Sequence, residues 1–375
     1  MFPPTVKKEG LSARTIPIIR VGASPAQRNS RLEYDEVPAP TIRQLAQIQF
    51  VKGSNGSDMR DPISRWSSMT PVVWLYPGEN YFPSDIGAQL VHTKPEINFT
   101  VVEGYENPLT LNNLDSLNSY GTGGTDVYLT SVDDITTNPA WLNGVKPDST
   151  GKTDGATSVA IIVNDHGDGL VDAFYMYFYA FNWGGVLLDI QEVDLHVGDW
   201  EHNMVRFQNG TPTQVWYSQH GFGEAFTYDC LEKQGVRPVT YSGNGSHANY
   251  AINGTHDHTI PNVNLPDAGV LTDYTDKGTL WDPLLGAYFY SYDASAKTYT
   301  AYDPSYPTAF LQYLGTWGDE QYPNSDPRQH EILGISATAE FTSGPTGPED
   351  KQLNRTEVCP VASGYVCDVR TELTS

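Results

Sequence analysis

The chain has 375 residues, with 22 Lys or Arg against 45 Asp or Glu, which gives a formal net charge of -23 at pH 7. This charge argues against nucleic acid and anionic membranes as partners, because phosphate-rich surfaces attract basic proteins. Charged residues make up 18% of the chain and aromatic residues 12%, with 23 Tyr, a composition typical of β-rich proteins.

Residues 1–45 contain many prolines and no sustained hydrophobic periodicity, so we expect an N-terminal arm. A helix is predicted over 41–51, where apolar residues recur at helical spacing. No stretch approaches the roughly 18 apolar residues of a membrane span. The first residues also lack the apolar core of a signal peptide. We therefore expect either that a signal was removed or that the protein is cytosolic.

From Pro71 onward, short β-branched and aromatic runs alternate with Gly, Pro and Asn, as they do in strands. The run AFYMYFYAFNWGG predicts a central strand that is buried on both faces. Three further strands, predicted in VGDWEHNMVRF, TQVWYSQH and RPVTYSGNGSHANY, form one wall of a cleft. LLGAYFYSYDA and TYTAY predict a hairpin. The expected fold class is mainly β, with a sandwich or jelly-roll-like core, peripheral short helices and long loops.

Three parts are expected along the chain: an N-terminal arm at 1–45, a single β-rich globular domain at 46–342 and a C-terminal strap at 343–375. Cys359 and Cys367 lie in a loop short enough to close as a disulfide, which leaves Cys230 unpaired. Three unrelated buried thiols are the alternative.

Six N-x-S/T sequons favour passage through the secretory pathway, although a chain rich in Asn, Ser and Thr also produces such triplets by chance. Together with the cysteine pair, they predict a secreted or vacuolar-lumenal protein. The sequons begin at Asn55, Asn98, Asn209, Asn244, Asn253 and Asn354.

The strand VGDWEHNMVRF carries two carboxylates on one face. Residues alternate between the faces of a strand, so Asp199 and Glu201 share the face of Val205 and Phe207, which is expected to point inward. Two carboxylates about 7 Å apart along a buried strand raise each other's cost of ionisation, as in an acid/base pair or a cation site. A solvated strand end is the alternative.

Six of the nine histidines lie between residues 196 and 258, in the region of these carboxylates. Imidazoles that cluster with carboxylates supply metal ligands or general acid/base groups, although each histidine alone is more often structural. We predict that His220 and His247 join Asp199 and Glu201 as catalytic residues in one cleft. The predicted substrate-binding residues are Trp200, His202, Trp216 and Tyr250, with Trp200 and His202 packed on the opposite strand face.

A divalent ion such as Ca²⁺ or Zn²⁺ is considered as a cofactor. His256 and His258 share a face if their segment is extended, although a surface pair is the better interpretation. NDHGDGLVD resembles a calcium loop around Asp168, but His is a poor calcium ligand, and a hairpin turn at Asp168 and Gly169 is favoured. Motifs of the common serine hydrolases, zincins and nucleotide enzymes are absent from the sequence.

Longer motifs resemble those of the fungal vacuolar protein sorting-associated protein 62 family: VGDWEHNMVRF, VWYSQH, EKQGVRPVTYSGNGSHANY, GTHDHTIP, VLTDYTDKGTLWDPLLGAYFYSYDA, LGTWGDEQYP and SGPTGPEDKQLNR. Plant proteins of unknown function share the shorter DWEH and H-A-x-Y cores. The resemblance extends from about residue 70 to 367. It implies a link to the delivery of proteins to the vacuole, which is a cellular role. It does not imply which residues would be catalytic. The positions that fall on these motifs include Asp199, Trp200, Glu201, His202, His220 and His247.

Three functions fit these observations. The first is a glycan-acting hydrolase or lyase that uses the inward carboxylate pair with assisting histidines, in which aromatic rings stack on sugars. The second is a non-catalytic binding or vacuolar trafficking factor with a structural polar or metal site. The third is a lumenal structural protein without a small ligand.

Overall fold

The computed structural model describes residues 62–187, 190–257, 271–361 and 366–373. The chain divides into two compact units, Met1–Gly56 and Ser57–Ser375, and the described residues all belong to the second. The predicted arm at 1–45 and the predicted helix at 41–51 lie outside the described residues.

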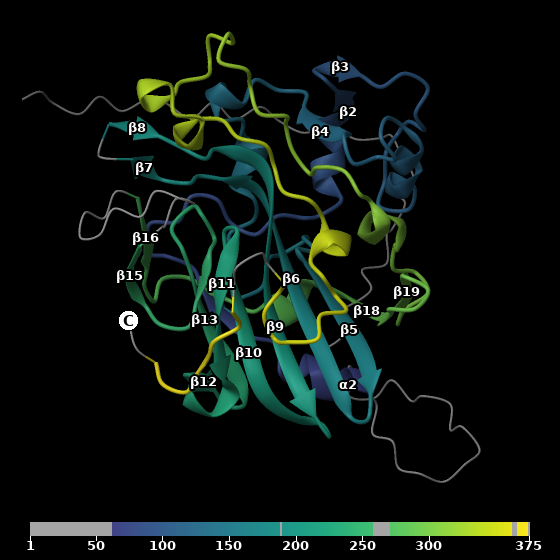
Figure 1. Cartoon of the computed structure of the whole chain (residues 1–375), viewed down its shortest axis with the longest axis vertical. Coiled ribbons are helices and arrows are strands. Elements are labelled where there is room, and N and C mark those ends of the chain that lie inside the picture. The colour runs from purple at the N-terminus through teal and green to yellow at the C-terminus, as the bar shows by residue number, and fades with distance from the viewer. Residues whose placement is uncertain (1–61, 188–189, 258–270, 362–365, 374–375) are drawn as a thin grey trace, which may run out of the picture. The chain divides into compact units, whose positions relative to one another are not determined.

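An eight-stranded sheet forms the centre of the second unit, in the order β19-β18-β5-β6-β9-β10-β11-β20 (Figure 1). Every residue of β6 after the first is buried, which confirms the expected central strand. The sheet confirms the mainly β fold class. Its strands are β5 (Val159–Gly167), β6 (Leu170–Asn182), β9 (His196–Gln208), β10 (Thr211–Gln219), β11 (Phe222–Thr227), β18 (Ala287–Asp293), β19 (Thr298–Ala301) and β20 (Val369–Arg370).

A smaller sheet packs on one face of the large one. Tyr175, Tyr177 and Tyr179 of β6 face it and contact Val73 and Trp281 in a shared apolar core, so the two sheets form a sandwich. The strand order is β12-β13-β1-β17, and β14 also pairs with β13. The strands are β1 (Val72–Trp74), β12 (Lys233–Gln234), β13 (Arg237–Ser242), β14 (Asn249–Tyr250) and β17 (Leu280–Trp281).

The other face of the large sheet is covered by loops and short helical turns. Phe174 and Phe178 of β6 pack there with Trp200 and Trp317 in a second apolar core. The helices are α2 (Pro62–Ser67) and the 3-10 turns Ala88–Val91, Leu114–Ser119, Ile135–Thr137, Ala140–Asn143, Tyr228–Cys230, Pro283–Gly286, Ala309–Gln312, Ile332–Gly334, Ser336–Thr338 and Pro348–Asp350. The remaining strands are β2 (Thr93–Ile97), β3 (Thr100–Val101), β4 (Tyr128–Ser131), β7 (Val186–Leu187), β8 (Gln191–Glu192), β15 (Gly254–Asp257) and β16 (Thr272–Thr275).

Tight turns set the register of the central strands. Asp168 and Gly169 between β5 and β6 have φ of 51° and 75°, and Asn209 and Gly210 between β9 and β10 have 52° and 75°. Positive φ at both central residues characterises the two-residue hairpin turn that matches strand twist. The favoured hairpin at Asp168 is thus confirmed, and so is the later hairpin, since β18 pairs antiparallel with β19.

One prediction about the strands was wrong. The third strand beside β9 and β10 is β11, while the segment RPVTYS forms β13 in the opposite sheet. Gly223 lies inside β11. A Cβ there would come within 2.3 Å of Trp216 and of the Tyr217 carbonyl oxygen, so close packing explains this glycine.

The C-terminal segment is closed on itself by a disulfide and is held to the large sheet by hydrogen bonds from Arg206. Cys359 and Cys367 form the predicted disulfide. Arg206 of β9 pairs with the fully buried Asp172 at 2.7 Å and donates to the backbone carbonyl oxygens of Arg355 and Thr356.

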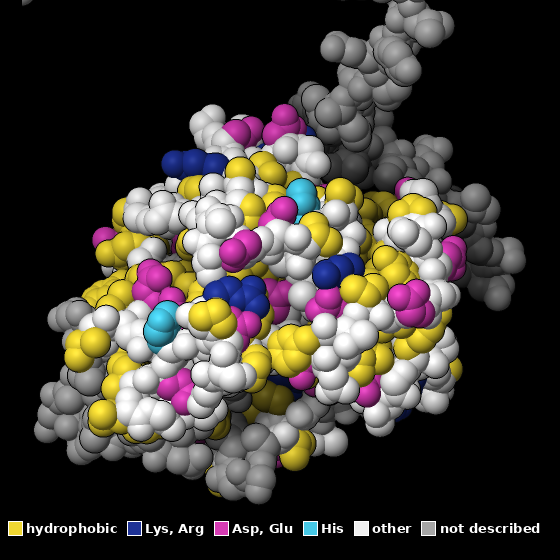
Figure 2. All heavy atoms as spheres, turned by 90° about the horizontal axis from the view of Figure 1, so that it is seen from above, with side chains coloured by type: hydrophobic (Ala, Val, Ile, Leu, Met, Phe, Trp, Pro, Cys, Tyr) yellow, Lys and Arg dark blue, Asp and Glu magenta, His cyan; other side chains and the backbone are white. Residues whose placement is uncertain are grey.

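Charged side chains are dispersed on the face seen in Figure 2, where Lys and Arg stand apart with Asp and Glu between them. This pattern agrees with the excess of acidic residues in the sequence. Among the described residues, we find no helix with the length and hydropathy to cross a membrane.

Candidate functional site

The two carboxylates on β9 lie at its start, opposite the end of β6. Asp199 pairs with Tyr179 and Glu201 with Tyr177 in an unbroken antiparallel register, so strand alternation holds through the motif. Asp199 is 4% exposed and Glu201 6%. Gly198 makes this arrangement possible, because a Cβ there would lie 2.0 Å from the carbonyl oxygen of Trp317.

Asp199 is hydrogen bonded to His247 from the loop between β13 and β14. His247 Nδ1 donates to Asp199 Oδ2 at 2.8 Å, and Nε2 of the same ring donates to the carbonyl oxygen of Tyr81 at 2.8 Å. The ring stacks on Tyr179 with centroids 3.7 Å apart. Because both ring nitrogens face acceptors, the arrangement suits the doubly protonated imidazolium.

The electrostatics of His247 agree with this protonation state. Burial opposes the charged form, but the hydrogen bond to Asp199 and the charge of Glu79 outweigh it and raise the pKa of His247. Glu79 also holds the loops in place. Its Oε1 accepts from the backbone N–H groups of Asn80 and Tyr81, and its Oε2 accepts from that of Gly245 at 2.9 Å.

Glu201 has a different environment from Asp199. The hydroxyl of Ser218 donates to Glu201 Oε2 and also accepts the backbone N–H of His202 at 2.8 Å. Burial, together with the nearby charge of Asp199, raises the pKa of Glu201 well above its usual range, although Ser218 and His220 act in the opposite direction. Glu201 is therefore a neutral carboxylic acid at pH values where ordinary glutamates are ionised.

Asp273 of β16 accepts hydrogen bonds from a second group of polar side chains. His220 Nε2 donates to Asp273 Oδ2 at 2.7 Å, the Tyr250 hydroxyl donates to the same oxygen at 2.6 Å, and Ser246 Oγ donates to Oδ1 at 2.5 Å. Burial opposes the charged form of His220, but the charge of Asp273 and its hydrogen bond to the ring outweigh burial and raise the pKa of His220 to about 9.

We define the carboxylate cluster as Glu79, Asp199, Glu201 and Asp273 with the side chains that they bind. The loop between β13 and β14 joins its two halves. Ser246 binds Asp273 while the next residue, His247, binds Asp199. His220 and His247 also have left-handed backbones, with φ of 52° and 56°. Non-glycine residues in this region cost of order 1–3 kcal/mol and are concentrated at functional sites.

The structure thus brings together the four predicted catalytic residues, Asp199, Glu201, His220 and His247, with Tyr250 beside them. It does not bring the predicted tryptophans there. Trp200 and Trp216 lie in the apolar core on the other face of the large sheet, where their rings pack against protein and are not presented to a ligand of the cluster.

His202 also lies on that other face, as expected from alternation. Its Nε2 accepts from the guanidinium of Arg355 at 3.0 Å. Burial and the charge of Arg355 lower the pKa of His202 well below its usual range, so the ring is neutral and serves as an acceptor for the C-terminal segment. Its ring points away from the carboxylate cluster, and its backbone N–H donates to Ser218 Oγ of the cluster at 2.8 Å.

The metal candidates do not converge. Asp168 is in the β5–β6 turn, and His256 stacks on Tyr250 with centroids 3.7 Å apart while bonding Thr275 at 3.0 Å. His258 lies outside the described residues. Within the part of the chain that the structure describes, no group of three or more His, Cys, Asp or Glu side chains has a geometry suited to a metal ion.

Sequence reasoning missed the partners that shape the cluster. Glu79 and Asp273 come from loop-flanked segments without periodicity, so no sequence pattern indicated them. Ser218 lies two residues before His220, in YSQH, and Ser246 lies directly before His247, in GSHANY. Their small hydroxyls, placed among carboxylates and histidines, were the signal available in the sequence.

The family model of vacuolar protein sorting-associated protein 62 matches residues 151–335. Two curated relatives come from Saccharomyces cerevisiae. Vacuolar protein sorting-associated protein TDA6 is 36% identical over 319 residues, and vacuolar protein sorting-associated protein 62 is 33% identical over 320 residues. Each alignment covers 77% of this chain and 66% of the relative. The chain therefore spans just under two thirds of the length of these relatives.

Solved structures resemble the chain only weakly. NLPPya in complex with glucosamine is 11% identical, with a TM-score of 0.26 over 50% of this chain and 65% of that chain. Necrosis and Ethylene inducing Protein 2, from the causal agent of cocoa's Witches Broom disease, is 13% identical, with a TM-score of 0.25 over 53% and 69%. No functional conclusion follows from scores at this level. The family match and the two yeast relatives show that the chain belongs to the vacuolar protein sorting-associated protein 62 family.

Proposed function

We propose that this protein is a hydrolase of glycosidic bonds, with Glu201 as the general acid and Asp199 as the general base. The supporting observation is the contrast between two carboxyl groups on one strand face. Burial and the charge of Asp199 raise the pKa of Glu201 well above its usual range, while Asp199 accepts a hydrogen bond from the imidazolium of His247. Glycoside hydrolysis needs this combination of one protonated carboxyl and one carboxylate.

In this reaction, Asp199 takes a proton from a water molecule whose oxygen attacks the anomeric carbon. Glu201 gives its proton to the glycosidic oxygen as the bond from carbon to that oxygen breaks. His247 positions Asp199, because the ring is held from both nitrogens by Asp199 and the Tyr81 carbonyl oxygen. Ser218 positions Glu201 by donating to Oε2, which leaves Oε1 to carry the acidic proton.

The charge of the cluster indicates the class of substrate. Its carboxyl groups, at Glu79, Asp199, Glu201 and Asp273, outnumber its two histidines, and the whole chain is acidic. An acidic site repels uronate sugars and accommodates neutral or amino sugars. Because eliminative lyases act on uronates, this charge favours hydrolysis over elimination.

We place this activity in the vacuolar lumen or outside the cell. The disulfide between Cys359 and Cys367 is a bond that persists in oxidising compartments. Several sequon asparagines are exposed in the structure, among them Asn98, Asn253 and Asn354. The family name links the relatives to vacuolar protein sorting.

A non-catalytic trafficking factor is the second candidate. The observation that favours it is the burial of the cluster: Asp199 and Glu201 are 4% and 6% exposed, and their hydrogen bonds are largely satisfied within the protein. In this interpretation, the network orders the edges of both sheets and positions an external binding surface.

Turnover of a glycan panel by wild type and by Glu201→Gln distinguishes the two candidates. The amide keeps the shape of the side chain and removes its proton, so we expect loss of roughly 100-fold or more in kcat. Glu103→Gln, an exposed position, is the matched control and should leave the rate unchanged. The proposal requires release of reducing ends from a neutral or amino-sugar glycan. No turnover by folded wild-type protein on the whole panel would instead support the trafficking factor.

A further inference from the structure

A cavity of about 530 Å³ lies apart from the carboxylate cluster, where β5, the β18–β19 turn and the C-terminal segment meet. Its volume falls within the roughly 300–1,000 Å³ of sites for small molecules. Polar side chains and one aromatic ring contribute to the lining, which includes Asn164, His166, Tyr292, Asp293, Ser295 and Asn354.

Asn354 at the rim of this cavity begins the sequon Asn354-Arg355-Thr356. The neighbours on either side, Leu353 and Arg355, are 2% and 3% exposed. Asn354 and Thr356 are exposed. The segment is therefore anchored by alternate residues, and the asparagine side chain is presented outward from a fixed backbone.

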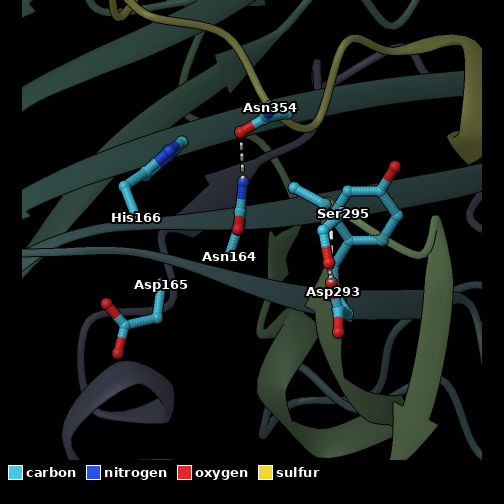
Figure 3. Close-up of a pocket in the computed structure, with 8 residues that line it drawn as sticks. Asn164, Asp165, His166, Asp293, Ser295 and Asn354 are labelled. Atoms are coloured by element: carbon cyan, nitrogen blue, oxygen red, sulfur yellow. Dashed lines mark hydrogen bonds between the residues drawn. The ribbon is translucent and has the colours of Figure 1, made fainter.

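The side-chain amide of Asn354 is oriented by Asn164 of β5. Asn164 Nδ2 donates to Asn354 Oδ1 at 3.4 Å and to the carbonyl oxygen of Leu353 at 2.9 Å (Figure 3). Asn164 itself is 1% exposed. Among the described residues, Asn354 Nδ2 has no hydrogen-bond acceptor within the protein. The oxygen is thus held and the nitrogen, which is the atom that N-linked sugars use, is left available.

Tyr292 supplies a surface on which a sugar can pack. It lies beside Asn164 in the parallel register of β18 and β5, and its ring contacts Tyr299 with centroids 5.1 Å apart. The ring is half-buried, so one side is supported by protein and the other faces the cavity. Asp293, Ser295 and His166 provide hydrogen-bonding groups around it.

We propose that Asn354 carries an N-linked glycan and that the first N-acetylglucosamine of this glycan occupies the cavity against Tyr292. In the transfer, Asn354 Nδ2 forms a bond to C1 of the sugar of a lipid pyrophosphate-linked oligosaccharide donor. The bond from C1 to the pyrophosphate oxygen breaks, the amide loses one proton, and the lipid pyrophosphate leaves. The sugar then bridges the C-terminal segment and the large sheet.

The test is secretion of the full chain from yeast or insect cells behind a host signal sequence. Native digestion with peptide N-glycosidase F in heavy-oxygen water, followed by peptide mass spectrometry, measures occupancy and release at each sequon. Asn98, an exposed residue of the β2–β3 turn, is the internal comparison. We expect a glycan at Asn354 that is released about tenfold more slowly than one at Asn98, the protection that one packed aromatic contact supplies.

Two variants separate the modification from its packing. Thr356→Ala should remove the glycan, and Tyr292→Ala should keep it but abolish the slow release. Tyr274→Ala, at a tyrosine that is 50% exposed, is the control and should behave as wild type. An unmodified Asn354 in secreted protein would overturn the proposal. Release at Asn354 as rapid as at Asn98, or slow release that persists in Tyr292→Ala, would also overturn it.

Discussion

His247 Nδ1 lies 2.8 Å from Asp199 Oδ2, although 48 residues separate them in the sequence. Nε2 of the same ring faces the carbonyl oxygen of Tyr81, so both ring nitrogens face acceptors, which favours the protonated imidazolium. The contact joins β9 to the loop before β14, and it places a fixed positive charge next to the carboxylate that the proposed reaction uses as a base.

Asp199→Asn should lower the pKa of His247. The amide preserves the shape but removes the negative charge that, together with Glu79, raises this pKa. Nitrogen NMR titration of the ring is the measurement, and we expect the wild-type imidazolium to persist above the usual midpoint of about 6.5. A His247 ring that is neutral at pH 6 in the wild type would contradict this account.

His220 should make the stability of the protein depend on pH. Its pKa is raised to about 9 in the folded state, above the value of about 6.5 in an unfolded chain. Its stabilisation is therefore complete below about pH 6.5 and is lost as the pH rises through about 9. This difference in pKa between the folded and unfolded states contributes about 3 kcal/mol to the free energy of unfolding.

Urea unfolding between pH 6 and 9.5 measures this effect. His220→Gln should flatten the decline in the free energy of unfolding over that interval. His330→Gln, at a side chain that is 62% exposed, should leave the decline as in the wild type. A decline that His220→Gln does not change would assign the pH dependence to other groups.

Gly198→Ala should destabilise the start of β9. The added Cβ would lie 2.0 Å from the Trp317 carbonyl oxygen, so backbone must move, at a cost of about 1–3 kcal/mol or more. Gly104→Ala is a matched control. It also has positive φ, 78° against 68° for Gly198, but its Cβ would meet nothing within 4 Å. Equal losses in thermal unfolding would show that backbone conformation, not the close approach, accounts for Gly198.

Arg206→Met should loosen the C-terminal segment. It leaves the fully buried Asp172 without its guanidinium partner and removes donors to the carbonyl oxygens of Arg355 and Thr356. Breaking a buried pair on one side costs about 3–5 kcal/mol. We expect faster amide exchange from residue 353 onward, and a double variant with Asp172→Asn that costs less than the sum of the single changes. Additive losses would show that the two side chains do not act as a pair.

The strands near the site were predictable because their patterns are local. Alternation along β9 placed Asp199 and Glu201 on one face, and the Asp168-Gly169 pair marked a turn. The twofold period is a property of neighbouring residues, so one sequence is sufficient to detect it.

The partners of these carboxylates were not predictable in the same way. Glu79 reaches the cluster from a turn after β1, and Asp273 from the short strand β16. Their positions depend on how separate segments pack across the sandwich, which no local period encodes. Trp200 and Trp216, which both lie in the core on the other face of the sheet, were proposed as substrate-binding residues for a related reason. Composition alone does not separate an aromatic ring that stacks on a ligand from one that fills a core.

The protonation state of Glu201 tests the central claim most directly. In protein labelled with carbon-13 at glutamate carboxyl groups, NMR titration follows each carboxyl, and the signal lost in Glu201→Gln identifies this one. Burial and the charge of Asp199 raise the pKa of Glu201, so we predict a carboxyl that stays protonated after ordinary glutamates have ionised near pH 4.3. A Glu201 that titrates with those exposed glutamates would contradict the assignment of a general acid to this site.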